Sequence, residues 1–210
     1  MNFFSFKHRL DDYFYELVNR AMVTHFIVQK ALGKKKFMKA NVELHNKHKD
    51  RRGFLVANGP SINSQNLKLL KNEITFFVNR SFLHKDYSYI EPTYHIFVDN
   101  KLATGEWPIS FLDEVLRQNN DVIFLLNAKW YKLEKFQKYI NNNKFKIYWV
   151  DMKLFTTPFD SNRTIDLTKI TYGAAVTGVA KMGMIYMGIK DIYFLGKDGN
   201  GLCYELTNTD

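Results

Sequence analysis

From Gly53 onward, short apolar segments alternate with segments of helical pattern, and this alternation limits the possible folds more than any other feature. Six segments have the length and composition of buried strands: Gly53–Ala57, Ile74–Val78, Tyr94–Val98, Val122–Leu126, Lys146–Val150 and Asp191–Leu195. Helical patterns lie between several of them: Ile109–Arg117, Lys129–Asn141 and Ala174–Met187. Buried strands that alternate with helices are typical of a parallel sheet covered on both faces. We therefore predict an α/β, Rossmann-like nucleotide-binding domain over residues 53–210, with a mainly parallel sheet flanked by helices.

Residues 1–52 form a different part of the chain. Apolar side chains recur at near-helical spacing through residues 1–32, and Gly33 with the three lysines after it ends the pattern. These 52 residues hold 12 Lys and Arg against 5 Asp and Glu, a balance of +7, while the net charge of the whole chain is +9. Asn41–Arg52 is polar and has the composition of a linker. We predict a basic helical extension and linker before the sheet.

The apolar stripe of this extension leaves two interpretations open. The helix packs on the core or on a second copy of the chain, which would make a homo-oligomer. Alternatively, residues 1–40 contact a membrane peripherally, where anionic headgroups attract the lysines. Acidic Asp11, Asp12 and Glu16 weaken attraction to lipid and favour packing. Nucleic acid is not an expected partner, because no RNA- or DNA-binding motif accompanies the charge.

Cys203 is the single cysteine, which excludes a disulfide framework and a zinc cluster built on cysteines. A lone cysteine fits a reducing cytoplasm. No apolar run approaches the roughly 20 residues that a membrane-spanning helix needs, and residues 1–32 lack a signal-peptide pattern. We therefore expect a cytoplasmic protein, placed at the inner membrane face if the extension binds lipid.

Each predicted strand is followed by polar residues. The ends of the six strands are Asn58-Gly59-Pro60-Ser61, Asn79-Arg80, Asp99-Asn100, Asn127, Asp151 and Gly196-Lys197-Asp198. One such end could be turn chemistry alone, since Asn and Asp favour turns. Six along the carboxyl edge of one parallel sheet predict a hydrogen-bonding rim for a polar ligand. In the first turn, Gly59 lets a ligand approach the main chain, and Asn58 and Ser61 supply polar groups without bulk.

A second candidate site lies where the last helical pattern opens, in the segment Thr171–Ala180. Thr171 has the chemistry of an N-cap, and the first amides of a helix favour an anion such as phosphate. Gly173 would let the helix or a phosphate approach closely. The same small residues equally suit tight packing of the helix on the sheet. Thr171 and Gly173 are therefore candidate nucleotide-binding residues.

Several common enzyme signatures are absent. The chain has neither the Walker phosphate loop nor the Gly-x-Gly-x-x-Gly fingerprint, which disfavours a usual kinase or dinucleotide enzyme. It lacks an Asp-x-Asp pair, which disfavours a metal-dependent sugar transferase of the usual sort. We expect no metal ion and no bound cofactor. Asp198 is the best-placed carboxylate and our candidate catalytic base, with a role as a turn residue the open alternative.

These motifs resemble two groups of bacterial proteins. Asn58–Ser61, Leu69–Phe76 and Val78–Arg80, together with the block Gly173–Asp198, resemble a family found with surface-polysaccharide genes. That family is described as similar to the archaeal 6-hydroxymethylpterin pyrophosphokinase. The same blocks resemble the bacterial sialyltransferases that use CMP-sialic acid. The resemblance covers residues 45–205 loosely.

The sialyltransferase resemblance implies a metal-independent glycosyltransferase of surface glycan biosynthesis, which uses a CMP-linked or other nucleotide-activated sugar and a glycan acceptor. The residues it places in the nucleotide pocket are Asn58, Gly59, Pro60, Ser61, Asn79 and Asn100. Arg80 would neutralise the charge of the leaving group if it points inward.

The chain also departs from the sialyltransferase pattern. It has Lys169 and Tyr172 where those enzymes have an arginine and a serine, and their general-base histidine lies well beyond the last strand. Because this sequence ends at Asp210, we expect a fragment or a reduced member. Two alternatives stay open. One is a pterin-type pyrophosphokinase that uses ATP and magnesium, with Asp99, Asp151 and Asp198 as candidate ligands. The other is a non-catalytic nucleotide-binding scaffold.

Overall fold

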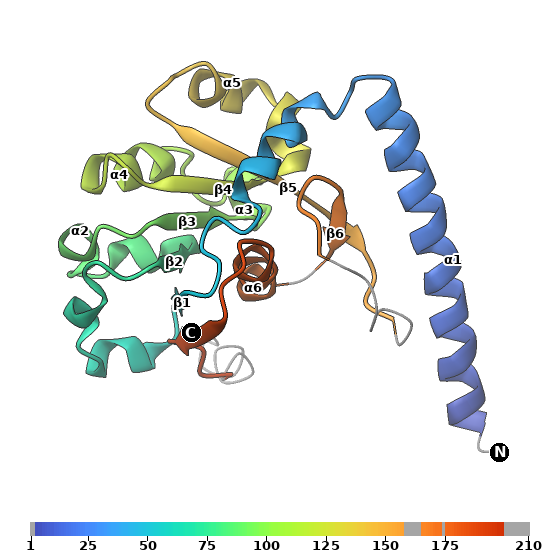
Figure 1. The fold of residues 1–210 in the computed structure, drawn as a ribbon, viewed down its shortest axis with the longest axis horizontal. Helices are drawn as coiled ribbons and strands as arrows, with labels where there is room; N and C mark the ends of the chain where they lie inside the picture. The colour runs from blue at the N-terminus through green and yellow to red at the C-terminus, as the bar shows by residue number, and fades with distance from the viewer. Residues whose placement is uncertain (1–2, 158–164, 174, 200–210) are drawn as a thin grey trace.

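The computed structural model describes residues 3–157, 165–173 and 175–199. Within these residues, seven strands form one sheet in the order β6-β5-β4-β3-β2-β1-β7, and each neighbouring pair is parallel (Figure 1). The strands are β1 (Arg52–Val56), β2 (Thr75–Val78), β3 (Tyr94–Phe97), β4 (Ile123–Asn127), β5 (Lys146–Leu154), β6 (Ile170–Tyr172) and β7 (Asp191–Leu195). The predicted α/β, Rossmann-like fold is confirmed.

Helices cover both faces of the sheet. The α-helices are α1 (Phe3–Ala31), α2 (Tyr87–Ile90), α3 (Lys101–Thr104), α4 (Phe111–Gln118), α5 (Glu134–Ile140) and α6 (Val176–Tyr186). The 3-10 helices are η1 (Lys36–Leu44), η2 (Pro60–Ser64), η3 (Leu67–Leu70), η4 (Asn79–Leu83) and η5 (Ala128–Lys132). Strands β1 to β6 cross the sheet in chain order, and α6 then carries the chain back so that β7 lies on the other side of β1. The winding direction thus reverses at β1, where open α/β sheets commonly bind ligands.

Side chains that alternate along the strands build one apolar layer on each face. On β1, Val56 joins the cluster under α4 and α5, while Leu55 joins the cluster under α6. On β2, Phe77 joins the first of these clusters and Phe76 joins the second. In the β1–β2 register, the pairs Leu55–Phe76 and Val56–Phe77 therefore consist of core residues. A strand buried on both faces reads as a continuous apolar run, which is why the central strands were predictable.

The far edge of the sheet differs from the prediction. β5 continues to Leu154, so Asp151 lies inside this strand instead of following it, and it pairs with Ile170 of β6. Thr171 belongs to β6, and α6 begins only at Val176 with Ala175 at the N-cap position. The predictions of Thr171 as an N-cap and of Gly173 at a helix start are therefore wrong. The extended pairing with β5 takes precedence over local capping chemistry.

The predicted helix over Lys129–Asn141 is also divided. The side chain of Asn127 accepts a hydrogen bond from the backbone N–H of Lys129, at 3.1 Å, and starts the 3-10 helix η5. Leu133 is extended, and α5 begins after it. Local side-chain bonding to the backbone here competes with a continuous α-helix.

The segment expected as a linker is tied to the domain. In η1, Met38, Asn41 and Leu44 are buried. Nδ2 of Asn41 donates to the carbonyl oxygens of Trp149 and Leu167, at 2.7 and 2.6 Å. A single buried amide here satisfies two backbone acceptors, one in β5 and one in the segment before β6, and a polar composition does not reveal that.

We expect Asn41→Ala to lower the free energy of unfolding by about 2 kcal/mol, because it leaves two buried carbonyl groups without a donor. Chemical denaturation would measure the change. Asn66→Ala is a suitable control, since this exposed asparagine makes no side-chain capping bond to η3. Equal stability of the two variants would show that the buried amide bonds of Asn41 contribute nothing.

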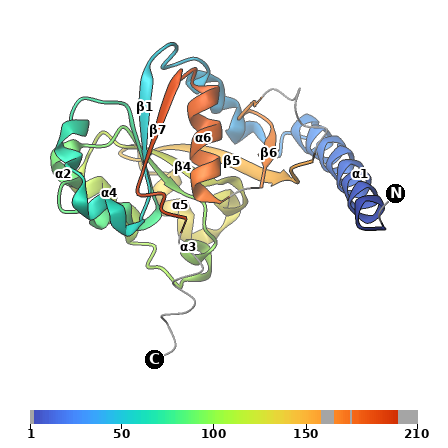
Figure 2. The same ribbon diagram turned by 90° about the horizontal axis from the view of Figure 1, so that it is seen from below.

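Helix α1 lies beside the β5–β6 edge and extends away from the sheet (Figures 1 and 2). Its attachment includes Asn19, whose side chain donates to the carbonyl and accepts from the N–H of Phe155, both at 2.8 Å. Many apolar side chains of α1 are exposed: Leu10, Tyr13, Phe14, Tyr15, Leu17, Ile27 and Val28. Within the described residues, no helix combines the length and apolar character needed to cross a bilayer.

Candidate functional site

The turns that follow β1 and β7 are bonded to each other at the carboxyl edge of the sheet. The N–H of Gly59 donates to the carbonyl oxygen of Gly196 at 2.7 Å. The N–H of Ser61 donates to Oδ2 of Asp198 at 2.9 Å, and the hydroxyl of Ser61 donates to Oδ1 of the same carboxylate. A Cβ atom at residue 59 would lie 2.6 Å from Oδ2 of Asp198, which requires glycine there. The Asn-Gly-Pro-Ser turn is thus held in one conformation.

The contacts of Asp198 indicate a positioning role. The hydrogen bonds from the side chain and backbone of Ser61 hold the pKa of this carboxyl below its usual range. Both carboxylate oxygens are engaged, so accepting a proton from a substrate would break a bond that fixes the turn. The role of Asp198 as the catalytic base stays a prediction, and this geometry favours its alternative as a turn residue.

A cavity of about 480 Å³ opens beside this turn. Its lining comes from the segment after β1, the segment after β2 and the segment after α3: Asn58, Ile62, Asn63, Arg80, Ser81, Leu83, His84 and Trp107. The cavity brings together Asn58 and Arg80, two predicted site residues that follow different strands. It offers amide groups, one guanidinium, one imidazole and one indole ring, which suits a ligand with a phosphate and a ring.

Two buried polar atoms beside the cavity lack a hydrogen-bond partner within the described residues. They are the hydroxyl of Ser81, which lines the cavity, and Oδ1 of Asn79. The relative exposures of these residues are 3% and 8%. Buried polar groups without partners are rare, and a ligand or an ordered water molecule commonly completes their bonding.

A buried histidine supports this segment from below. Asn79 has a φ angle of 48°, in the left-handed region. Its carbonyl oxygen can only accept, so Nε2 of His95 donates to it, at 2.9 Å. Nδ1 of His95 then accepts from the hydroxyl of Tyr87, also at 2.9 Å. This chain of bonds fixes where the backbone turns after β2 and therefore where Arg80 and Ser81 stand.

Burial lowers the pKa of His95 to about 3, so the ring stays neutral in the folded protein. The unfolded chain binds a proton near the ordinary value of 6.5, hence stability is lost as the pH falls below that value. Between pH 7 and pH 5, we expect His95 to contribute about 2 kcal/mol to this loss.

Denaturation of His95→Gln at both pH values would test this, because the variant should lose less stability on acidification than the unchanged protein. His25→Gln, at an exposed position, should keep the full dependence. An unchanged dependence in His95→Gln would contradict the assignment of a neutral, buried His95.

Other sequence-selected residues lie elsewhere. Pro60 begins η2 next to the cavity, and exposed Asn100 stands at the start of α3 without lining it. The hydroxyl of Thr171 contacts the carbonyl oxygen of Asp151 at 3.5 Å, and the N–H of Gly173 donates to Leu154. β6 lies five strands from β1, roughly 24 Å at about 4.8 Å per strand. Thr171 and Gly173 are therefore not brought to this cavity.

Sequence reasoning missed Trp107, His84 and Asn63. Trp107 follows α3, and its N–H donates to the carbonyl oxygen of Lys101 at 3.0 Å, which folds the chain back toward the edge of the sheet. His84 follows η4, and its Nδ1 accepts from the N–H of Asp86 at 3.2 Å, so Nε2 carries the proton. Trp107 and His84 lie farther along the chain than the polar residues that directly follow β3 and β2.

The three carboxylates considered for magnesium have separate partners. Oδ1 of Asp99 accepts from the backbone of Lys101, Asp151 pairs with Lys35 at 2.7 Å, and Asp198 accepts from Ser61. Within the described residues, there is no group of three or more His, Cys, Asp or Glu side chains that could hold a metal ion.

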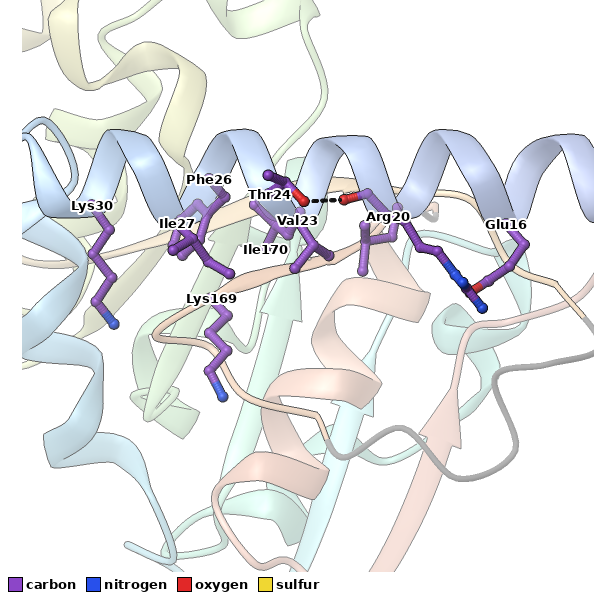
Figure 3. A pocket seen from close by; sticks show the side chains of 10 residues that line it. Glu16, Arg20, Val23, Thr24, Phe26, Ile27, Lys30, Lys169 and Ile170 are labelled. Carbon is purple, nitrogen blue, oxygen red and sulfur yellow. Dashed lines mark hydrogen bonds and ion pairs between the residues drawn. The ribbon is translucent and has the colours of Figure 1, made fainter.

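A larger cavity, of about 760 Å³, lies between α1 and the β5–β6 edge (Figure 3). Its walls are mainly apolar, and the cations around it are Arg20, Lys30 and Lys169. Glu16 and Lys169 have charged partners, since Arg20 pairs with Glu16 at 3.2 Å and Lys169 with Asp166 at 3.0 Å. No site residue predicted from the sequence lines this cavity, so we place the candidate site at β1 and β2.

No family model matches the chain, and no curated protein matches its sequence. Among solved structures, it is similar to the MAf glycosyltransferase from Magnetospirillum magneticum AMB-1, with 12% sequence identity and a TM-score of 0.47. The match covers 78% of this chain and 27% of that one, so the chain spans about a quarter of the structure that it matches. A similarity of this size says nothing about the activity of this chain.

Proposed function

We propose that the protein is a glycosyltransferase-like enzyme of surface glycan biosynthesis that binds a nucleotide-activated sugar at the carboxyl ends of β1 and β2. The observation that supports the nucleotide site is the cavity that joins Asn58 to Arg80. Its wall includes the hydroxyl of Ser81, which has no hydrogen-bond partner among the described residues. The resemblance of the two sequence blocks supplies the reaction class. A CMP-linked sugar is the first donor to test.

In this proposal, different cavity residues contact the base, the ribose and the phosphate of the nucleotide. Trp107 offers a ring surface to the base, and Asn58 hydrogen-bonds the ribose. Arg80 and the Nε2–H of His84 face the phosphate, where they stabilise the charge of the leaving group. Asp198 holds the turn in place through Ser61.

The transfer step needs no change in oxidation state. The hydroxyl oxygen of the glycan acceptor forms a bond to the anomeric carbon, and the bond from that carbon to the nucleotide phosphate oxygen breaks. The phosphate leaves with the electron pair, and the hydroxyl proton passes to a base. We assign Arg80 and His84 to the leaving group and no metal ion to this step.

Thermal-shift and calorimetric titrations with CMP, UDP-sugars and ATP, each with and without magnesium, test the proposal. Stabilisation by a cytidine or uridine nucleotide without magnesium supports it. Stabilisation by ATP only with magnesium supports the pyrophosphokinase alternative instead. Binding of a nucleotide without sugar transfer or hydrolysis would leave the scaffold alternative, and no stabilisation by any nucleotide would contradict the nucleotide site.

The amino-terminal extension suggests where the enzyme works. We propose that residues 1–40 contact the inner face of a membrane, supported by the exposed apolar residues of α1 and by the excess of basic residues. Co-sedimentation with anionic vesicles at low and high salt tests this. Replacing exposed Phe14 and Leu17 by glutamate should abolish sedimentation, whereas a stable dimer that hides both side chains would support the homo-oligomer instead.

A further inference from the structure

A second cavity at the carboxyl edge of the sheet is strongly basic. Its volume is about 330 Å³. The residues that line it are His25, Gln29, Lys34, Lys35, Phe37, Ala128, Lys129, Tyr131, Lys132 and Lys153. They come from α1, the segment before η1, η1 itself, η5 and β5, so the cavity lies at β4 and β5. It shares no residue with the candidate nucleotide cavity at β1 and β2.

The charges around this cavity are unbalanced. Five lysines line it, and the acidic group in contact with them is Asp151, which is completely buried beneath the cavity. Oδ2 of Asp151 lies 2.7 Å from Nζ of Lys35 and 3.6 Å from Nζ of Lys153. Within the described part of the chain, Lys34, Lys129 and Lys132 form no ion pair. The cavity therefore concentrates positive charge that the described residues neutralise only in part, through Asp151.

The lysines are also held in position. The carboxylate of Asp151 orients Lys35 and Lys153 from below, and their side chains are only 15% and 30% exposed. Lys129 and Lys132 are three residues apart in η5, and residues at this spacing eclipse each other on a 3-10 helix. The rings of Phe37 and Tyr131 stack with centroids 3.8 Å apart, which fixes the segment carrying Lys35 against η5.

We propose that this cavity binds a ligand through a phosphate or diphosphate group. Like-charged ammonium groups around one concave surface raise the local concentration of anions, and an anion that enters relieves their mutual repulsion. A phosphate group has several acceptor oxygens that lysines from different elements can reach together. This site is additional to the nucleotide cavity and does not depend on the proposed reaction.

Calorimetric titration of the full chain with inorganic pyrophosphate at low salt tests the proposal. We expect saturable 1:1 binding that weakens at high salt, because screening reduces the attraction between charges. The variant Lys129→Ala/Lys132→Ala should lose about tenfold or more in affinity, which corresponds to roughly 1.4 kcal/mol. The matched control is Lys144→Ala/Lys181→Ala, which removes the same charge at exposed positions outside the cavity and should bind as the unchanged protein does.

A second arm identifies the source of the phosphate. Vesicles that contain phosphatidic acid are compared with vesicles of phosphatidylcholine alone, using the same two variants. If pyrophosphate binds the unchanged protein and the control variant but not Lys129→Ala/Lys132→Ala, the site is one for a soluble phosphate ester. If phosphatidic acid vesicles show this pattern of binding and pyrophosphate does not bind, the ligand is a lipid headgroup. Absence of binding in both arms, or equal losses in the two variants, would overturn the proposal and leave the nucleotide cavity unaffected.

Discussion

Replacing Asp151 by alanine is expected to lower the free energy of unfolding by about 3 to 5 kcal/mol. The carboxylate is completely buried and contacts Lys35 and Lys153. Its removal leaves the ammonium group of Lys35, whose side chain is mostly buried, without a counter-charge. Removing one partner of a buried ion pair destabilises a protein by more than the pair stabilised it, because the remaining charge stays buried without a counter-charge.

Asp121 provides a matched control for this measurement. It pairs with Lys146 at 3.7 Å, and its side chain is 95% exposed. Asp121→Ala should therefore change stability by less than about 1 kcal/mol. Chemical denaturation of both variants at one pH gives the comparison. If Asp151→Ala unfolds with the same free energy as Asp121→Ala, the buried ion pair has no structural role.

A single methyl group at residue 59 is expected to weaken nucleotide binding about a hundredfold, roughly 2.7 kcal/mol. In Gly59→Ala, the new Cβ would meet the carbonyl oxygen of Gly196 and the carboxylate of Asp198. The turn after β1 must then separate from the turn after β7, which displaces Asn58 from the cavity. Both obstacles are polar and fixed, one of them by the backbone, so a small side-chain rotation cannot relieve them.

Gly183→Ala is the control for this variant, because a Cβ there would lie 3.8 Å from Leu125, in ordinary contact. Gly183 lies inside α6, where alanine should maintain or raise stability by about 0.5 to 1 kcal/mol. Titration with the nucleotide that stabilises the unchanged protein measures both variants. If a folded Gly59→Ala protein binds the nucleotide with unchanged affinity, the turn after β1 is not part of the nucleotide site.

The centre of the fold was predictable because its strands are buried on both faces. β1 to β4 were located within a residue or two, since apolar runs bounded by polar turns have few other interpretations. β7 was also located, although it is an edge strand and largely exposed, because residues 192–195 form an apolar run that ends at Gly196. β6 was missed because it has only three residues and owes its extended form to pairing with β5. The sequence around Asp151 has the composition of a strand end. In the structure β5 continues past Asp151, because the ion pair with Lys35 balances the buried charge inside the sheet.

The candidate site was predictable only where it follows a strand directly. Asn58 and Arg80 meet in the cavity because parallel strands end at one edge of the sheet. Trp107 and His84 reach it through the folding of longer connections, for which local sequence has no periodic signal. The basic cavity was still less predictable from local sequence, because Lys34 and Lys35 lie about a hundred residues before Lys129 and Lys132. The composition shows the excess of lysines, but only the folded chain shows that these lysines surround one cavity.

The most direct test of the nucleotide site is a titration of ¹⁵N-labelled protein with CMP, followed by the backbone amide signals in NMR spectra. We expect saturable shifts for the residues after β1, from Asn58 to Asn63 except Pro60, which has no amide proton. We expect the same for the residues after β2, from Asn79 to His84, and for Trp107. The signals of Lys129 and Lys132 should move little at equal occupancy. Shifts confined to the basic cavity, or no shifts at millimolar CMP and at millimolar UDP, would contradict a nucleotide site at the carboxyl ends of β1 and β2.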